Sequence, residues 1–259
     1  MCYSNEDRPP AAPGAQQSAT GEALVLSSSD GNQFAAYIAR PATPTSASVI
    51  IYPDVRGLHD FYKALALRFA EVGITALAID YFGRTAGLSA RDDSFEFWPH
   101  VQQVKFDSFK LDVQAALDYL QHNGQGSGPV FVIGFCMGGS FTLLSSTIPD
   151  FGFAGVIPFY AGLSRAFGGQ GTVLDVADKV VYPVLGLFGG ADEGIPEDQR
   201  QQLDMKLTTA KVEHTIHAYP GAPHSFFDRK ATDFAEASTD AWKRVLAFIQ
   251  SHTPTQAAS

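Results

Sequence analysis

The 259-residue sequence has few cysteines, a deficit of basic residues and no long apolar run. Its two cysteines, Cys2 and Cys136, are too few for a disulfide framework, which favours a reducing compartment. The sequence has 18 Lys and Arg against 27 Asp and Glu, which gives a net charge of −9. Proteins that bind the phosphate backbone of nucleic acids present a basic face, which this charge does not favour. No stretch approaches the ~18 apolar residues of a membrane span, and the first residues lack the apolar core of a secretory signal. These absences argue against nucleic-acid and membrane partners and predict a cytoplasmic protein.

Core-forming residues, by contrast, are abundant. The sequence is 45% apolar and 17% charged, which is typical of a globular chain. After an N-terminal tail at 1–21, expected to be mobile, short apolar runs alternate with stretches of helical periodicity. The runs of strand length cover 22–31, 34–40, 48–53, 74–80, 129–135, 153–161, 182–190 and 212–220. The helical stretches cover 59–72, 106–122, 138–147, 197–210 and 231–252.

This alternation of strands and helices predicts the α/β class. The first two runs indicate an antiparallel hairpin, and the later ones a doubly wound, mostly parallel sheet with helices on both faces. We expect one domain over 22–252, followed by a C-terminal tail at 253–259. The aromatic-rich connection 81–104 is long enough to be a functional loop. In such sheets ligands bind beyond the carboxyl ends of the strands, so the chemistry is expected there.

A nucleophile motif follows the strand 129–135. It reads Gly134-Phe135-Cys136-Met137-Gly138-Gly139, a G-x-nucleophile-x-G elbow with Cys in the usual serine position. The sharp turn needs residues without bulk on either side of the nucleophile. It also places the thiol at a helix N-terminus, which favours the thiolate, and makes the Met137 N–H an oxyanion donor. The alternative interpretation is a buried, inert cysteine beside a tight glycine turn.

An acid and a base follow two later strands. Asp192 comes after 182–190, and His224 lies in a loop after 212–220. The chain order of nucleophile, acid and base is the one that α/β-hydrolases use. His224 can take the thiol proton, while Asp192 fixes its tautomer. Taken singly, Asp192 could be a turn residue and His224 a solvated loop histidine, but together with Cys136 they predict a catalytic triad.

With these motifs, the sequence resembles the dienelactone hydrolases, which are α/β-hydrolases with a Cys-Asp-His triad. The resemblance spans about residues 20–250. The motifs that carry it are PDVRGLHD (53–60), GFCMGG (134–139), GGADEGIP (189–196) and GAPHSFFD (221–228). It implies the α/β-hydrolase fold, with Cys136 as nucleophile, His224 as base and Asp192 as the residue that orients it.

The resemblance also implies a carboxylate that tunes the nucleophile. The matching residue is Asp54, where the best-known members of the family have Glu. Because Asp is one methylene shorter, a water or a shifted backbone could lie between it and Cys136. The alternative is that Asp54 only forms the turn after Pro53. The backbone N–H of Val55 is expected to be the second oxyanion donor.

Substrate contacts are predicted from arginines and aromatic residues. The family's type substrates carry a carboxylate held by two arginines, and Arg91 matches one of them. The second falls near Asp228, with Arg229 one position further on, which departs from the family pattern. Arg56 and Arg84 are other candidates for anion binding, although Arg84 and Arg229 read better as surface residues.

Aromatic residues gather at the strand ends and in the connection 81–104. Trp98, Tyr160 and Phe226 are candidates to line a pocket that faces the elbow. Such a lining favours a hydrophobic or aromatic ester or lactone. No metal or other cofactor is expected, because His214 and His217 lie on a predicted strand and would point to opposite faces.

The sequence therefore predicts a hydrolase that cleaves ester or lactone C–O bonds through a thioester acyl-enzyme. Its partner is a small-molecule ester or lactone, and the protein is expected to be a monomer or a small homo-oligomer. One alternative is a carboxylesterase or thioesterase of broad specificity. The other is a non-catalytic homologue that binds a small lactone, since function does not follow from fold.

Overall fold

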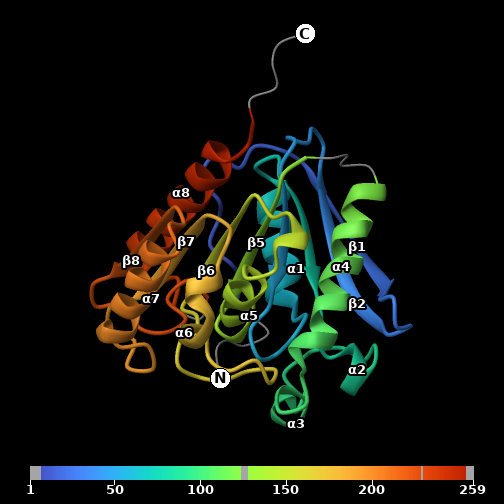
Figure 1. Ribbon diagram of the computed structural model, residues 1–259. Coiled ribbons are helices and arrows are strands. Elements are labelled where there is room, and N and C mark those ends of the chain that lie inside the picture. Colours follow the sequence, from blue (N-terminus) through green and yellow to red (C-terminus); the bar gives the residue numbers. More distant parts are fainter. Residues whose placement is uncertain (1–6, 124–127, 229, 255–259) are drawn as a thin grey trace.

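The computed structural model describes residues 7–123, 128–228 and 230–254 (Figure 1). In these residues eight strands form one sheet in the order β1-β2-β4-β3-β5-β6-β7-β8. The strands are β1 (Ala19–Ser27), β2 (Gln33–Pro41), β3 (Ser48–Tyr52), β4 (Thr75–Ile79), β5 (Val130–Phe135), β6 (Gly155–Phe159), β7 (Val184–Gly189) and β8 (His214–Tyr219). The strands β1, β2 and β4 are antiparallel neighbours, and the pairs from β4 through β3 to β8 are parallel. The predicted hairpin and mostly parallel sheet are confirmed.

Helices connect the parallel strands. They are α1 (Asp60–Ala70), α2 (Gly83–Ala86), α3 (Phe97–Val101), α4 (Phe106–His122), α5 (Met137–Ser145), α6 (Val173–Val176), α7 (Glu197–Thr209) and α8 (Ala235–Ser251). The described residues also form the short 3₁₀ helices η1 (Pro149–Phe151) and η2 (Ala177–Lys179). The connection 81–104 thus contains α2 and α3, and the segment 162–180 contains α6 and η2. None of the helices in the described residues is long and apolar enough to cross a membrane.

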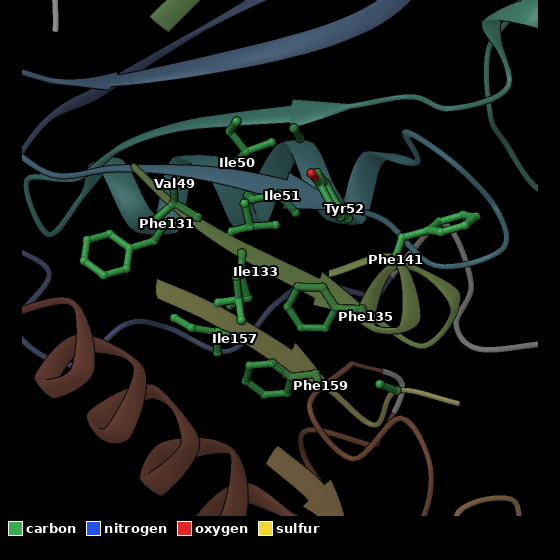
Figure 2. Packing of buried hydrophobic residues seen from close by; sticks show 14 of the residues in the cluster. Val49, Ile50, Ile51, Tyr52, Phe131, Ile133, Phe135, Phe141, Ile157 and Phe159 are labelled. Carbon is green, nitrogen blue, oxygen red and sulfur yellow. The ribbon is translucent and has the colours of Figure 1, made fainter. Parts of the chain in front are cut away.

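Helices cover both faces of the sheet. Every residue of β3, β4, β6 and β7 is buried, and successive side chains of a strand point to opposite faces. Figure 2 shows this core along the neighbouring strands β3, β5 and β6, whose carboxyl ends carry the aromatic side chains of Tyr52, Phe135 and Phe159. There Phe135 and Phe159 stack with ring centroids 4.8 Å apart. A rigid aromatic layer therefore underlies the edge at which the chemistry was expected.

The predicted N-terminal tail is wrong at its boundary. Ala19 pairs with Pro41 in the β1–β2 ladder, so the domain begins before residue 22. Residues further upstream also pack on it: Ala12 is buried, and Trp242 Nε1 donates to the Pro10 carbonyl oxygen at 3.0 Å. The sequence signal was weak because β1 is an edge strand whose residues are mostly exposed. The remainder of the predicted tails, 1–6 and 255–259, and Cys2 lie outside the described residues.

Candidate active site

The elbow holds Cys136 between β5 and α5. Cys136 has a φ of 55°, in the left-handed region that a side chain rarely adopts, and its N–H donates to the Phe159 carbonyl oxygen at 3.1 Å. A Cβ on Gly134 would lie 2.2 Å from the Gly138 carbonyl oxygen, and one on Gly138 would lie 2.1 Å from the Pro53 carbonyl oxygen. Both glycines are therefore required, and the strained turn presents the thiol at the start of α5.

The predicted acid and base meet beside this thiol. His224 Nδ1 lies 2.7 Å from Asp192 Oδ2, and the imidazole also shares a hydrogen bond with Cys136. Asp192 is buried, and its other carboxylate oxygen accepts from the Gly194 N–H at 2.9 Å. Three residues that are 56 and 32 positions apart in sequence thus form one hydrogen-bonded chain.

The charge state of His224 follows from these contacts. Burial alone would lower the pKa of the imidazole, but the hydrogen bond with Asp192 and the interaction with Cys136 outweigh it and raise the pKa of His224 to about 10. The imidazolium is therefore the favoured form at neutral pH, and it is the form that stabilises a neighbouring thiolate. The side chain stays 35% exposed, which leaves it open to solvent on one side.

Asp54 is fully buried directly after β3. Its Oδ1 accepts from the Arg56 N–H at 2.9 Å, and its own N–H donates to Tyr62 Oη at 3.0 Å. These contacts define a turn, as in the alternative interpretation, while its effect on Cys136 stays a prediction. The close approach of Gly138 to Pro53 brings this turn against the first turn of α5.

The roles of Met137 and Val55 as oxyanion donors stay predictions, and the position of each backbone N–H is compatible with that role. Met137 is the first residue of α5, so its N–H has no acceptor within the helix. Val55 lies in the turn after β3, which the elbow glycine contacts. Both residues are buried, which shields their N–H groups from bulk water.

The contacts of Arg91 do not support the prediction that it binds substrate. A guanidinium has five N–H groups, and all five are engaged inside the protein. Nε and Nη2 donate to the two carboxylate oxygens of Asp80 at 3.3 and 3.0 Å, and Nη2 also donates to the Gly87 carbonyl oxygen at 2.7 Å. Nη1 donates to the carbonyl and hydroxyl oxygens of Ser89 at 2.6 and 2.9 Å. Arg91 is 5% exposed and fixes the connection 81–104 to the end of β4.

The other candidate arginines are also ion-paired. Arg56 is 4% exposed, and its Nη2 lies 2.5 Å from Asp93 Oδ1. Arg84 forms ion pairs with Asp30 at 2.5 Å and with Asp112 at 2.8 Å. Arg84 therefore joins the β1–β2 turn to α4, and Arg229 lies outside the described residues.

Of the three candidate aromatics, only Trp98 has an exposed face. It is 46% exposed, and the Arg165 guanidinium lies 5.3 Å from its ring centroid. Tyr160 and Phe226 are fully buried, which does not support the prediction that they contact substrate. Tyr160 instead packs its ring on His224 with centroids 4.9 Å apart, and Phe226 packs on Tyr160 at 5.7 Å. Burial is a tertiary property that their positions in sequence did not reveal.

Two features of the site escaped the sequence reading. The Tyr160 hydroxyl donates to the buried carboxylate of Asp228 at 2.9 Å, and Arg165 lies between the rings of Trp98 and Phe167. Neither pair has a sequence signal, because its members are distant in the chain or lie in an irregular loop. Over the residues described, no group of three or more His, Cys, Asp and Glu side chains could hold a metal ion.

The model of the dienelactone hydrolase family matches residues 34–253. The chain belongs to this family. As a member, the chain is a hydrolase of the carboxylic ester type.

Similar dienelactone hydrolases come from several sources. The chain is 29% identical to a Synechocystis protein named "Putative carboxymethylenebutenolidase", over 88% of this chain and 95% of that one. A Yersinia pestis protein of the same name is 27% identical, over 86% of each chain. The crystal structure of a dienelactone hydrolase-like promiscuous phosphotriesterase from metagenomic libraries has a TM-score of 0.73 and 21% identity. The match covers 90% of this chain and 99% of that chain, and it shows that the two proteins share a fold.

Proposed function

We propose that this dienelactone hydrolase family member cleaves ester or lactone C–O bonds through a thioester acyl-enzyme on Cys136. The observation that carries the proposal is the hydrogen-bonded chain from Asp192 through His224 to Cys136 at the strained elbow. A thiolate beside an imidazolium is an activated nucleophile with its proton donor already in place. The Met137 and Val55 N–H groups would bind the oxyanion.

The reaction divides into two half-reactions. In acylation the Cys136 thiolate attacks the carbonyl carbon, and collapse of the tetrahedral intermediate breaks the C–O bond as His224 gives its proton to the leaving alkoxide. A lactone keeps that alcohol on the acyl chain, whereas an ester releases it. In deacylation neutral His224 takes a proton from water, the hydroxide attacks the thioester, and the C–S bond breaks. The products are the acid and the regenerated thiolate–imidazolium pair.

We infer further that the substrate does not need to carry a carboxylate near the ester or lactone group. All five N–H groups of Arg91 donate hydrogen bonds within the protein, and Arg56 forms an ion pair with Asp93. The second arginine of the family pattern falls near Asp228, which is buried, with Arg229 one position further on. The net charge of −9 also repels anions at long range. These observations favour the alternative of an esterase with broad specificity over a strict requirement for a substrate carboxylate.

A substrate panel with matched variants tests both parts. Initial rates are measured on a carboxylate-bearing dienelactone, neutral lactones and short aryl esters, with wild type, Cys136→Ala and Cys2→Ala. We expect turnover of neutral substrates by wild type and Cys2→Ala, and none by Cys136→Ala. Activity that survives in Cys136→Ala would overturn the mechanism. Binding of a lactone without turnover would instead favour the non-catalytic homologue, and a strong preference for the dienelactone would contradict the inference that no substrate carboxylate is needed.

A further inference from the structure

Tyr160 is the residue that joins the nucleophile to the histidine loop. It directly follows β6, and the carbonyl oxygen of the preceding residue, Phe159, accepts from the Cys136 N–H at 3.1 Å. On the other side, its hydroxyl donates to Asp228 Oδ2 at 2.9 Å. Asp228 is four residues after His224 in the same loop. Tyr160 and the residue before it thus contact the two segments that must be placed relative to each other for catalysis, Phe159 through its backbone and Tyr160 through its side chain.

The arrangement is rigid. Tyr160 is fully buried and has a φ of 33°, a left-handed conformation that a bulky residue keeps only when its surroundings impose it. Its N–H donates to the Leu187 carbonyl oxygen of β7 at 2.8 Å, which fixes the backbone. Asp228 is 3% exposed, and its N–H donates to the Ser225 carbonyl oxygen at 3.3 Å. Both ends of the hydrogen bond are therefore anchored in ordered backbone.

The ring of Tyr160 packs against the imidazole of His224 and restricts its position. The two ring centroids are 4.9 Å apart, with the planes inclined at 57°. The tyrosine ring also packs on Phe226, which follows His224 by two residues, with ring centroids 5.7 Å apart. A shift of the tyrosine would therefore move the histidine loop as a unit. Because Nδ1 of His224 must face Asp192 while the ring reaches Cys136, small rotations of the imidazole would break one of the two contacts.

We propose that Tyr160 and Asp228 are positioning residues, which hold His224 between Asp192 and Cys136 through the Tyr160–Asp228 hydrogen bond. This inference rests on the proposed cysteine hydrolase, but it concerns the geometry of the thiolate–imidazolium pair and not the substrate. Because Asp228 is buried, loss of this hydrogen bond would remove a donor that its carboxyl group cannot replace with bulk water. Of the titratable groups in the described residues, Cys136, Asp192 and Tyr160 interact with His224, and Asp228 interacts with Tyr160.

The experiment measures the rate at which iodoacetamide alkylates Cys136 as a function of pH, because this rate follows the thiolate fraction and needs no substrate. It is run in a Cys2→Ala background on Tyr160→Phe, Asp228→Ala and Asp228→Asn. Tyr160→Phe and Asp228→Ala are expected to move the thiolate limb to higher pH, because the imidazolium no longer faces the thiol. Asp228→Asn keeps an oxygen acceptor for Tyr160 and is expected to restore most of the wild-type profile.

Hydrolysis rates are measured on the same variants. A misplacement of the base on the ångström scale lowers kcat on the order of 10- to 100-fold, with a smaller change in KM. Tyr219→Phe is the matched control, because its hydroxyl also donates to a carboxylate, Asp240 Oδ2, at 3.0 Å. It is expected to lower the melting temperature and to leave the alkylation profile unchanged.

The outcomes separate the inference from the proposed function. Alkylation profiles of Tyr160→Phe and Asp228→Ala that superimpose on wild type, with only a lower melting temperature, would show a merely structural pair and overturn the inference. Shifted profiles with rescue by Asp228→Asn would support it, even if no ester is turned over. Turnover that survives in Cys136→Ala would instead contradict the proposed function and leave the alkylation result to stand alone.

Discussion

Gly138, in the first turn of α5, faces the Pro53 carbonyl oxygen so closely that a Cβ would lie 2.1 Å from it. The same Cβ would lie 2.3 Å from the Tyr52 carbonyl oxygen. Since both obstacles are backbone atoms, neither can move aside without displacing the end of β3. The contact locks the helix that begins at the nucleophile against the turn that contains Asp54 and Val55.

Gly138→Ala is therefore expected to destabilise the protein by about 1–3 kcal/mol or more, because overpacking against backbone cannot be relieved by a rotamer change. Chemical denaturation measures the loss. Gly162→Ala is the control, because the nearest atom to its Cβ is Ser140 Oγ at 3.5 Å, an ordinary contact. Equal stability of the two variants would show that the end of β3 gives way easily.

Asp192→Asn is expected to lower kcat on the order of 10²- to 10⁴-fold, because the amide cannot hold the imidazole in the same tautomer and charge state. The His224 pKa, raised to about 10 in the wild type, should fall toward its ordinary value of about 6.5. An NMR titration of the histidine and steady-state kinetics measure the two effects. Asp198→Asn, at the exposed start of α7, is the control. A His224 titration that Asp192→Asn leaves unmoved would refute the assignment.

The stability of the protein is expected to fall as the pH drops from about 6.5 to about 4 because of His59. Burial and the nearby Arg56 guanidinium lower the pKa of His59 to about 4, despite the carboxylates of Asp60 and Asp93. The unfolded chain therefore binds more protons in this window, so protonation favours unfolding. A shift from 6.5 to about 4 corresponds to up to about 3 kcal/mol.

His59→Asn tests this pH dependence. His59 caps α1, with Nδ1 accepting from the Phe61 N–H at 3.3 Å, and asparagine can cap without titrating. The variant should flatten the curve of unfolding free energy against pH between 4 and 6.5. His122→Asn, at the exposed end of α4, should leave the slope unchanged. A slope that persists in His59→Asn would assign it to other groups.

Arg91→Ala is expected to cost on the order of 3–5 kcal/mol of stability, because it leaves the fully buried Asp80 carboxylate without its ion-pair partner. Arg68→Ala removes a half-buried pair with Glu71 on α1 and should cost less than about 1 kcal/mol. Denaturation curves give both values. We expect the ratio of kcat/KM for carboxylate-bearing and neutral substrates to stay constant in Arg91→Ala. A specific loss for the carboxylate-bearing substrate would restore the original prediction.

The strands and the three residues at their ends were accessible from sequence because the signals are local. A short, β-branched apolar run such as 49–52 is typical of a strand covered on both faces, and each turn after a strand shows its chemistry within a few positions. The elbow is the clearest example. The glycines at 134 and 138 are required by contacts within the turn and with the strand next to it. The sharp turn could therefore be predicted from the motif alone.

The partners of long side chains were beyond the reach of the sequence. Arg91 could equally bind a substrate or a carboxylate of the protein, and only the path of the connection 81–104 brings it to Asp80. Tyr160 stands at a strand end, where an aromatic residue can line a pocket or support a catalytic group. Its burial and the approach of Asp228, 68 residues away, depend on the packing of two loops. Local periodicity indicates which face of a helix or strand a side chain lies on. The residues that it contacts there depend on how segments distant in sequence pack together.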